Sequence, residues 1–130
     1  MAILLTGGAG YIGSHTAVEL LNQGEEVVIV DDLSNSSAEV IGRIGTITGR
    51  WPAFYQEDAA DRAAMERVFA EREIEAVIHF AGYKAVGESV AQPLRYYRNN
   101  LDTAMTVLEV MAAHGCRRFI FSSSATVYGT

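Results

Sequence analysis

Three glycines recur at intervals of three residues near the start of the chain, at Gly7, Gly10 and Gly13. The apolar segment before them, residues 2–6, predicts a short strand, and residues 11–23 have the apolar periodicity of a helix. Glycines at such a turn let the backbone approach a pyrophosphate, while the first turn of the helix offers N–H groups to that anion. The chain is thereby limited to folds in which a strand, a phosphate-binding turn and a helix follow one another directly.

An acidic residue closes the second apolar segment. Residues 26–31 contain Val-Val-Ile-Val, which is typical of a parallel strand buried on both faces, and they end in Asp31. Asp31 lies 18 residues beyond Gly13, close to the roughly 20 expected for a carboxylate that binds an adenosine ribose. Such a carboxylate repels a 2′-phosphate, and residues 32–37 contain no Arg or Lys to bind one. Because the glycines also form G-x-G-x-x-G from Gly8, the sequence predicts a site for NAD rather than NADP.

Simpler interpretations of these residues stay open. The glycines could form a tight turn in another α/β fold, and Asp31 could be a solvated residue at the end of a strand. His79 lies within an apolar segment and is predicted to be a packed core histidine. No pair of histidines has the spacing of metal ligands, so no metal site is expected.

Strands and helices alternate along the rest of the chain. Further strands are predicted over residues 51–57, 75–80 and 118–122, and further helices over 38–44, over the segment capped by Asp61, and over 93–115. Repeated strand–helix–strand units require right-handed crossovers and an open parallel sheet. We therefore predict one α/β domain over residues 1–130, a Rossmann-type sheet of order 3-2-1-4-5. Since a sixth strand would come next, we expect a piece of a longer protein that lacks its substrate domain.

The composition argues against several classes of protein. No apolar run approaches the roughly 20 residues of a membrane span, so no membrane contact is expected. The net charge of −6 and the lack of a basic stripe argue against a nucleic-acid partner. Cys116 is the only cysteine, which excludes an internal disulfide or a cysteine-based metal cluster. With no leader before the first strand, a cytoplasmic protein is expected.

Three later segments are more specific than the glycine turn. Residues 79–89 read HFAGYKAVGES, residues 96–100 read YYRNN, and residues 121–129 read FSSSATVYG. Together with TGGAGYIGSH at residues 6–15, they resemble the UDP-glucose 4-epimerase family of the extended short-chain dehydrogenase/reductases. The resemblance covers the chain from Met1 to Thr130 and corresponds to the N-terminal part of that family.

The resemblance implies which residues contact NAD and a UDP-hexose. Tyr11 and Ile12 would bind the pyrophosphate through their backbone, Lys84 a phosphate or ribose and the substrate, and Asn99 the nicotinamide side. Ser124 would be the catalytic residue that holds the sugar hydroxyl being oxidised, although a solvated Lys84 and a capping Ser124 remain alternatives. Further cofactor contacts are implied at Asp32, Leu33, Ser34, Asn35 and Ser36 beside the ribose, at Asp58 and Ala59 beside the adenine, and at Phe80, Ala81, Gly82, Tyr83 and Ser122.

The resemblance also implies a reaction, the interconversion of UDP-glucose and UDP-galactose. In this family a tyrosine takes the C4 hydroxyl proton while hydride passes to NAD, and the 4-keto sugar receives the hydride on its other face. That tyrosine belongs to Tyr-x-x-x-Lys, a motif that this chain lacks, because Lys84 is its only lysine and residue 80 is Phe. The chain alone is therefore expected to be inactive.

Other interpretations of the function remain. Another nucleotide-sugar epimerase is one of them, while a 4,6-dehydratase would need an Asp-Glu pair where this chain has Ala125 and Thr126. A non-catalytic NAD-binding module is a third. The apolar residues around the helix over 93–115 and the open edge of the fifth strand predict a homodimer or a larger assembly.

Overall fold

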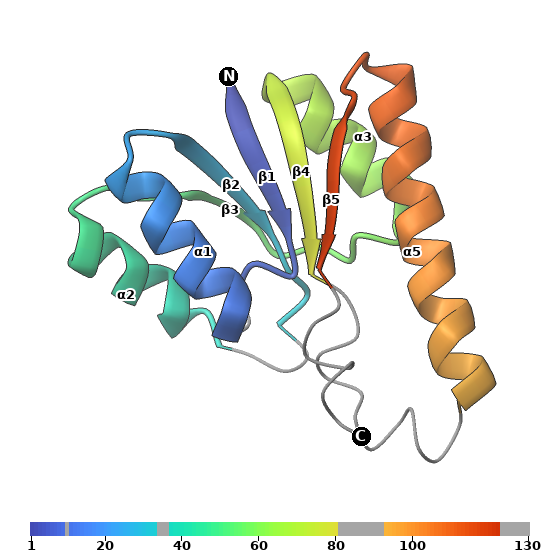
Figure 1. Ribbon diagram of the computed structural model, residues 1–130, viewed down its shortest axis with the longest axis horizontal. Helices are drawn as coiled ribbons and strands as arrows, with labels where there is room; N and C mark the ends of the chain where they lie inside the picture. The colour runs from blue at the N-terminus through green and yellow to red at the C-terminus, as the bar shows by residue number, and fades with distance from the viewer. Residues whose placement is uncertain (10, 34–36, 81–92, 123–130) are drawn as a thin grey trace.

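The computed structural model describes residues 1–9, 11–33, 37–80 and 93–122. Its elements are β1 (Ala2–Thr6), α1 (Tyr11–Asn22), β2 (Glu26–Val30), α2 (Glu39–Thr48), β3 (Ala53–Tyr55), α3 (Arg62–Glu71), β4 (Ile74–Phe80), α5 (Pro93–Ala113) and β5 (Arg118–Ser122). The five strands form one parallel sheet in the order β3-β2-β1-β4-β5 (Figure 1). The α/β class and the strand order predicted from the sequence are confirmed.

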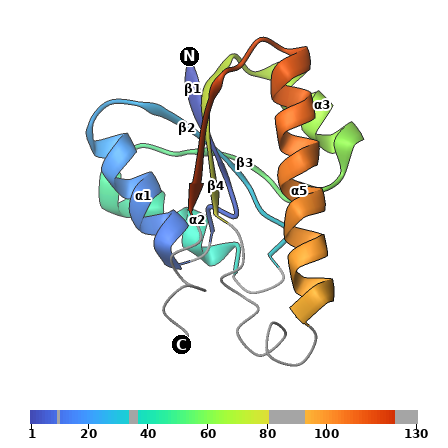
Figure 2. The same cartoon turned by 45° about the vertical axis from the view of Figure 1, so that its right-hand side comes forward.

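Helices cover both faces of the sheet (Figure 2). Because successive residues of a strand point to opposite faces, Leu5 and Ile29 pack with α1 and α2, whereas Leu4 and Val28 pack with α3 and α5. All four side chains are at most 2% exposed. Burial on both faces explains why the second strand is an uninterrupted apolar run rather than an alternating one.

The third helix begins at the predicted cap. The Asp61 carboxylate accepts a hydrogen bond from the N–H of Ala64 at 3.2 Å, and this satisfies one of the donors that a helix start leaves unpaired. The predicted apolar face of this helix is buried as well, at Ala64, Met65, Val68 and Phe69. Asp61 and this face therefore fix both the start and the rotation of α3.

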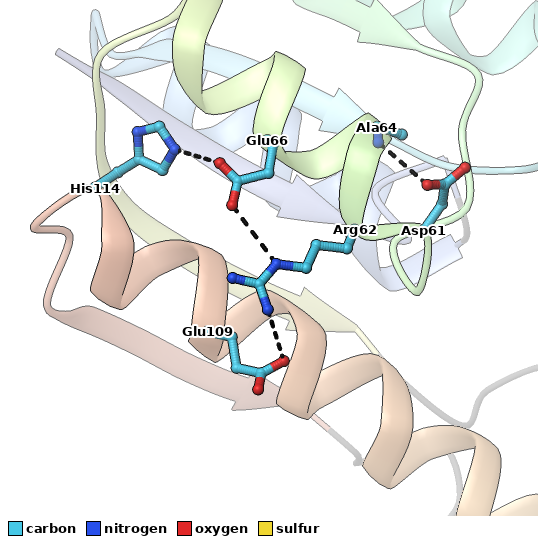
Figure 3. Close-up of polar contacts among 6 residues, drawn as sticks. All are labelled: Asp61, Arg62, Ala64, Glu66, Glu109 and His114. Carbon is cyan, nitrogen blue, oxygen red and sulfur yellow. Dashed lines mark hydrogen bonds and ion pairs between the residues drawn. The ribbon is translucent and has the colours of Figure 1, made fainter.

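A network of charged side chains connects α3 with the C-terminal part of α5 on the surface (Figure 3). Arg62 lies 3.6 Å from Glu66 and 3.5 Å from Glu109, and Nε2 of His114 lies 2.8 Å from the Glu66 carboxylate. The hydrogen bond with His114 lowers the pKa of Glu66 below its ordinary value. Since these side chains are substantially exposed, the network orients the two helices and adds little to the free energy of unfolding.

The second helix is longer than predicted. It continues past residue 44 through Gly45 to Thr48, although glycine is a poor helix former. Ile44 is fully buried against the sheet, so tertiary packing outweighs the local preference. The helix ends at Gly49, which has the left-handed φ of 71° that glycine adopts readily and whose N–H donates to the carbonyl of Gly45.

Helix α5 packs on the sheet with only part of the apolar face that its spacing predicts. Residues 94, 97, 101, 104, 108 and 111 step by three and four, and of these Leu101 and Leu108 are 64% and 44% exposed, whereas Met111 is buried. Val107 and Val110, which lie off that row, are fully buried. Apolar residues lie all round this helix, and periodicity alone therefore cannot select the packed side. In the part of the chain that the structure describes, no helix is long and apolar enough to cross a membrane.

Candidate dinucleotide site

The candidate site lies at the carboxyl edge of the sheet, toward which all five strands run (Figure 1). The strand order reverses beside β1, because β2 and β3 lie on one side of it and β4 and β5 on the other. Ligands of open parallel sheets bind outside the carboxyl ends of the strands at such a reversal. The glycine turn after β1 and Asp31 after β2 both emerge there.

The glycine turn is hydrogen-bonded to β2 and packs against α1. Gly7 has a left-handed φ of 75°, and its N–H donates to the carbonyl of Val30 at 2.7 Å. Gly13 lies in the first turn of α1, where a Cβ would come within 2.7 Å of the Gly8 Cα and 2.8 Å of the Gly7 carbonyl oxygen. Both contacts are with backbone, so a side chain at residue 13 would force the turn and the helix apart. Glycine at these positions keeps the N-terminus of α1 next to the turn, as anion binding requires.

Asp31 is a buried carboxylate rather than a solvated residue at a strand end. It is 4% exposed, and its two oxygens accept hydrogen bonds from the N–H of Ala9 at 3.0 Å and from the N–H of Leu33 at 2.8 Å. Leu33 has a left-handed φ of 63°, which is uncommon for a residue other than glycine. The contact with Ala9 could not be predicted, because no sequence pattern links residues 9 and 31.

The structure brings other predicted site residues to the same edge. Asp32 is exposed beside Asp31, and Asp58 is exposed in the turn before α3, where its carboxylate accepts from the N–H of Ala60 at 2.9 Å. Ala59 packs against the α3 and α5 side of the core. The ends of β4 and β5 place Phe80, which is buried, level with Ser122.

The remaining predicted residues are described in part or not at all. Ile12 is 38% exposed in the first turn of α1. Tyr11 begins α1, and Asn99 lies within α5. Gly10, Ser34, Asn35, Ser36, Ala81, Gly82, Tyr83, Lys84 and Ser124 lie outside the described residues.

A buried polar pair lies next to the glycine turn. Thr6 and His79 face each other in the register of β1 and β4, and the Thr6 hydroxyl is hydrogen-bonded to Nδ1 of His79. His79 is 3% exposed, as predicted for a core histidine, and its ring lies beside those of Phe119 and Phe121. Burial lowers the pKa of His79 from 6.5 to about 4, which keeps the ring neutral near pH 7. Among the described residues, Nε2 of this ring has no hydrogen-bond partner.

Comparison with known proteins places this geometry in a family. Residues 3–130 match the model of the NAD dependent epimerase/dehydratase family. The chain belongs to this family. Membership agrees with the glycine turn, with the acid after β2 and with the strand order described above. The cofactor of this family is NAD.

Individual members of the family are closely similar to the chain. The UDP-glucose 4-epimerase of Bacillus subtilis is 64% identical over 129 residues, and that of Haemophilus influenzae is 57% identical over 129 residues. Each alignment covers 99% of this chain and 38% of the relative. The chain thus spans well under half the length of these epimerases, and the predicted resemblance to their N-terminal part is confirmed.

Solved structures of family members have the same fold. A UDP-glucose 4-epimerase from Bifidobacterium longum in complex with NAD⁺ and UDP is 55% identical with a TM-score of 0.91, over 100% of this chain and 39% of that one. One from Stenotrophomonas maltophila, with bound NAD and formylated UDP-arabinopyranose, is 52% identical with a TM-score of 0.90, over 98% of this chain and 38% of that one. The five-stranded sheet therefore corresponds to the N-terminal part of epimerase structures.

Proposed function

We propose that this chain binds NAD and forms the NAD-binding part of a UDP-glucose 4-epimerase. The observation that carries the proposal is the combination of the turn packed against Gly13 with the buried Asp31 carboxylate at the next strand end. The turn and the N-terminus of α1 suit a pyrophosphate, and the carboxylate suits the hydroxyls of an adenosine ribose. The described residues of this edge therefore fit a dinucleotide.

The charge at the end of β2 favours NAD over NADP. A 2′-phosphate on the ribose would meet Asp31, which is buried, and Asp32 next to it, and like charges brought together cost several kcal/mol. Isothermal titration is expected to give a dissociation constant for NADP at least about tenfold higher than that for NAD. Equal or tighter binding of NADP would refute the assignment of this site.

The chain is proposed to supply cofactor binding and part of the substrate contact. When bound, NAD supplies the acceptor for the hydride that leaves C4 of the sugar. Ser124 is proposed to orient the C4 hydroxyl, and Lys84 to contact the cofactor and the UDP-hexose. A serine hydroxyl does not accept the proton of that hydroxyl at neutral pH, so oxidation needs the base of a Tyr-x-x-x-Lys motif.

Because the 130 residues contain no Tyr-x-x-x-Lys, the chain alone should not interconvert UDP-galactose and UDP-glucose. The test is to incubate purified chain with NAD and UDP-galactose and to follow UDP-glucose by NMR. A parallel sample of Ser124→Ala serves to detect contaminating host enzyme, whose activity that substitution cannot change. Turnover that is present in the chain and reduced in Ser124→Ala would contradict the expected inactivity.

Self-association is also proposed. Leu101, Met105 and Leu108 lie exposed on α5, and Ile120 and Phe121 lie exposed on β5, the strand at the sheet edge. Exposed apolar surface of this kind favours association. Light scattering is expected to give at least twice the mass of the 14.1 kDa chain, with a lower mass for Leu101→Glu/Leu108→Glu. A monomer mass at high concentration would contradict this expectation.

A further inference from the structure

The carboxylate of Asp31 contacts two loops at once. One oxygen accepts from the N–H of Ala9 in the glycine turn, and the other accepts from the N–H of Leu33 in the segment after β2. We propose that Asp31 is a positioning residue, which holds the glycine turn in the shape that receives a pyrophosphate whether or not a ribose is bound. This inference rests on the proposed NAD site and adds a role to the ribose contact.

The contact with Ala9 fixes the turn at a second point. Gly7 is already bound to β2 through the carbonyl of Val30 at 2.7 Å, and Ala9 is bound through Asp31 at 3.0 Å. Ala9 is 1% exposed, so its N–H would be costly to leave without a partner. A hydrogen bond to an ionised carboxylate is also stronger than one between neutral groups. The two contacts therefore attach both ends of the described turn to the end of β2.

The contact with Leu33 fixes the loop on the other side. A left-handed φ of 63° strains a leucine, and such strain persists only where neighbouring contacts hold it. The Asp31 oxygen at 2.8 Å from the Leu33 N–H is such a contact. A substitution made at Asp31 to admit NADP should therefore loosen both loops and weaken binding of the phosphates as well.

Amide hydrogen exchange in the nucleotide-free chain tests the positioning role directly. An asparagine at residue 31 presents one oxygen, so it can satisfy only one of the two N–H groups, and alanine satisfies neither. In Asp31→Ala, exchange at Ala9 and Leu33 should accelerate about tenfold or more relative to exchange at Gly7, whose partner is a backbone carbonyl. Asp31→Asn should show this at one of the two amides. Asp102→Asn, an equal change of charge at an exposed residue of α5, should leave all three amides unchanged.

A pair of nucleotides separates positioning from ribose binding. ADP carries the ribose hydroxyls, and 2′,3′-dideoxyadenosine diphosphate lacks them. Asp31→Ala should weaken both ligands, with a loss of about tenfold for the dideoxy nucleotide. The inference is overturned if the dideoxy nucleotide binds Asp31→Ala and the unaltered chain equally, or if exchange at Ala9 and Leu33 does not change relative to Gly7. If the unaltered chain binds neither nucleotide, the proposed function fails, and the exchange rates alone decide the inference.

Discussion

Replacing Gly13 by alanine is expected to reduce NAD affinity by about 100-fold and to destabilise the fold by about 1–3 kcal/mol. The added Cβ would lie 2.7 Å from the Gly8 Cα and 2.8 Å from the Gly7 carbonyl oxygen. Neither atom belongs to a side chain that could rotate away, so the first turn of α1 must move off the glycine turn. The N–H groups that would face the pyrophosphate move with it.

The matched control for this substitution is Gly42→Ala. Gly42 also lies inside a helix, but a Cβ there would have nothing within 4 Å. Alanine at this position should raise the free energy of unfolding by up to about 1 kcal/mol, because alanine is the better helix former, and it should leave NAD affinity unchanged. Urea unfolding and isothermal titration measure both quantities. An affinity in Gly13→Ala equal to that of Gly42→Ala would show that the turn does not form the phosphate site.

Acid is expected to remove about 3 kcal/mol of stability through His79 alone. Burial lowers the pKa of this histidine from 6.5 to about 4 in the folded chain. Between these two values the unfolded chain binds a proton that the folded chain does not. His79 therefore costs no stability above pH 6.5. The free energy of unfolding decreases as the pH falls from 6.5 to about 4, and the loss stays constant below that.

Urea unfolding at pH 7, 6, 5 and 4 measures this loss. In His79→Asn the pH dependence should become weaker, while the amide can still pair with the Thr6 hydroxyl. His15→Gln is the control, because it replaces an exposed histidine of α1 and leaves the contact between His114 and Glu66 intact. Protonation of Glu66, whose pKa is lowered, also decreases the free energy of unfolding as the pH falls through the folded pKa of this carboxyl. His79→Asn leaves this effect of Glu66 unchanged. Equal slopes for His79→Asn and the unaltered chain would contradict the expectation.

The sheet could be predicted from the sequence because burial on both faces leaves a strong pattern. The run Val27–Val30 is typical of a strand buried on both faces, and the Asp61 cap identifies the start of α3. The helices were harder to predict where packing decides the outcome. α2 runs through Gly45 because Ile44 is buried, and α5 has apolar residues all round, so its packed side depends on which side meets the sheet.

The candidate site also has features that the sequence pattern predicts and features that it does not. The glycines and Asp31 are recognisable from sequence because phosphate and ribose binding impose residue types at fixed spacing. The hydrogen bond from Ala9 to Asp31 leaves no such mark, because a backbone N–H is donated by almost any residue. Similarly, the Thr6–His79 pair depends on the register of β1 with β4, which no local pattern records.

The central place of β1 has a consequence for how the protein is made. β1 pairs with β2, which follows within the first 30 residues, but its other neighbour is β4, whose Ile74 pairs with Ala2. During translation one edge of β1 therefore stays unpaired until more than 70 residues have been synthesised. Contacts so distant in sequence close slowly. The growing chain thus carries an open strand edge until β4 has been made, at the stage when chaperones meet nascent proteins.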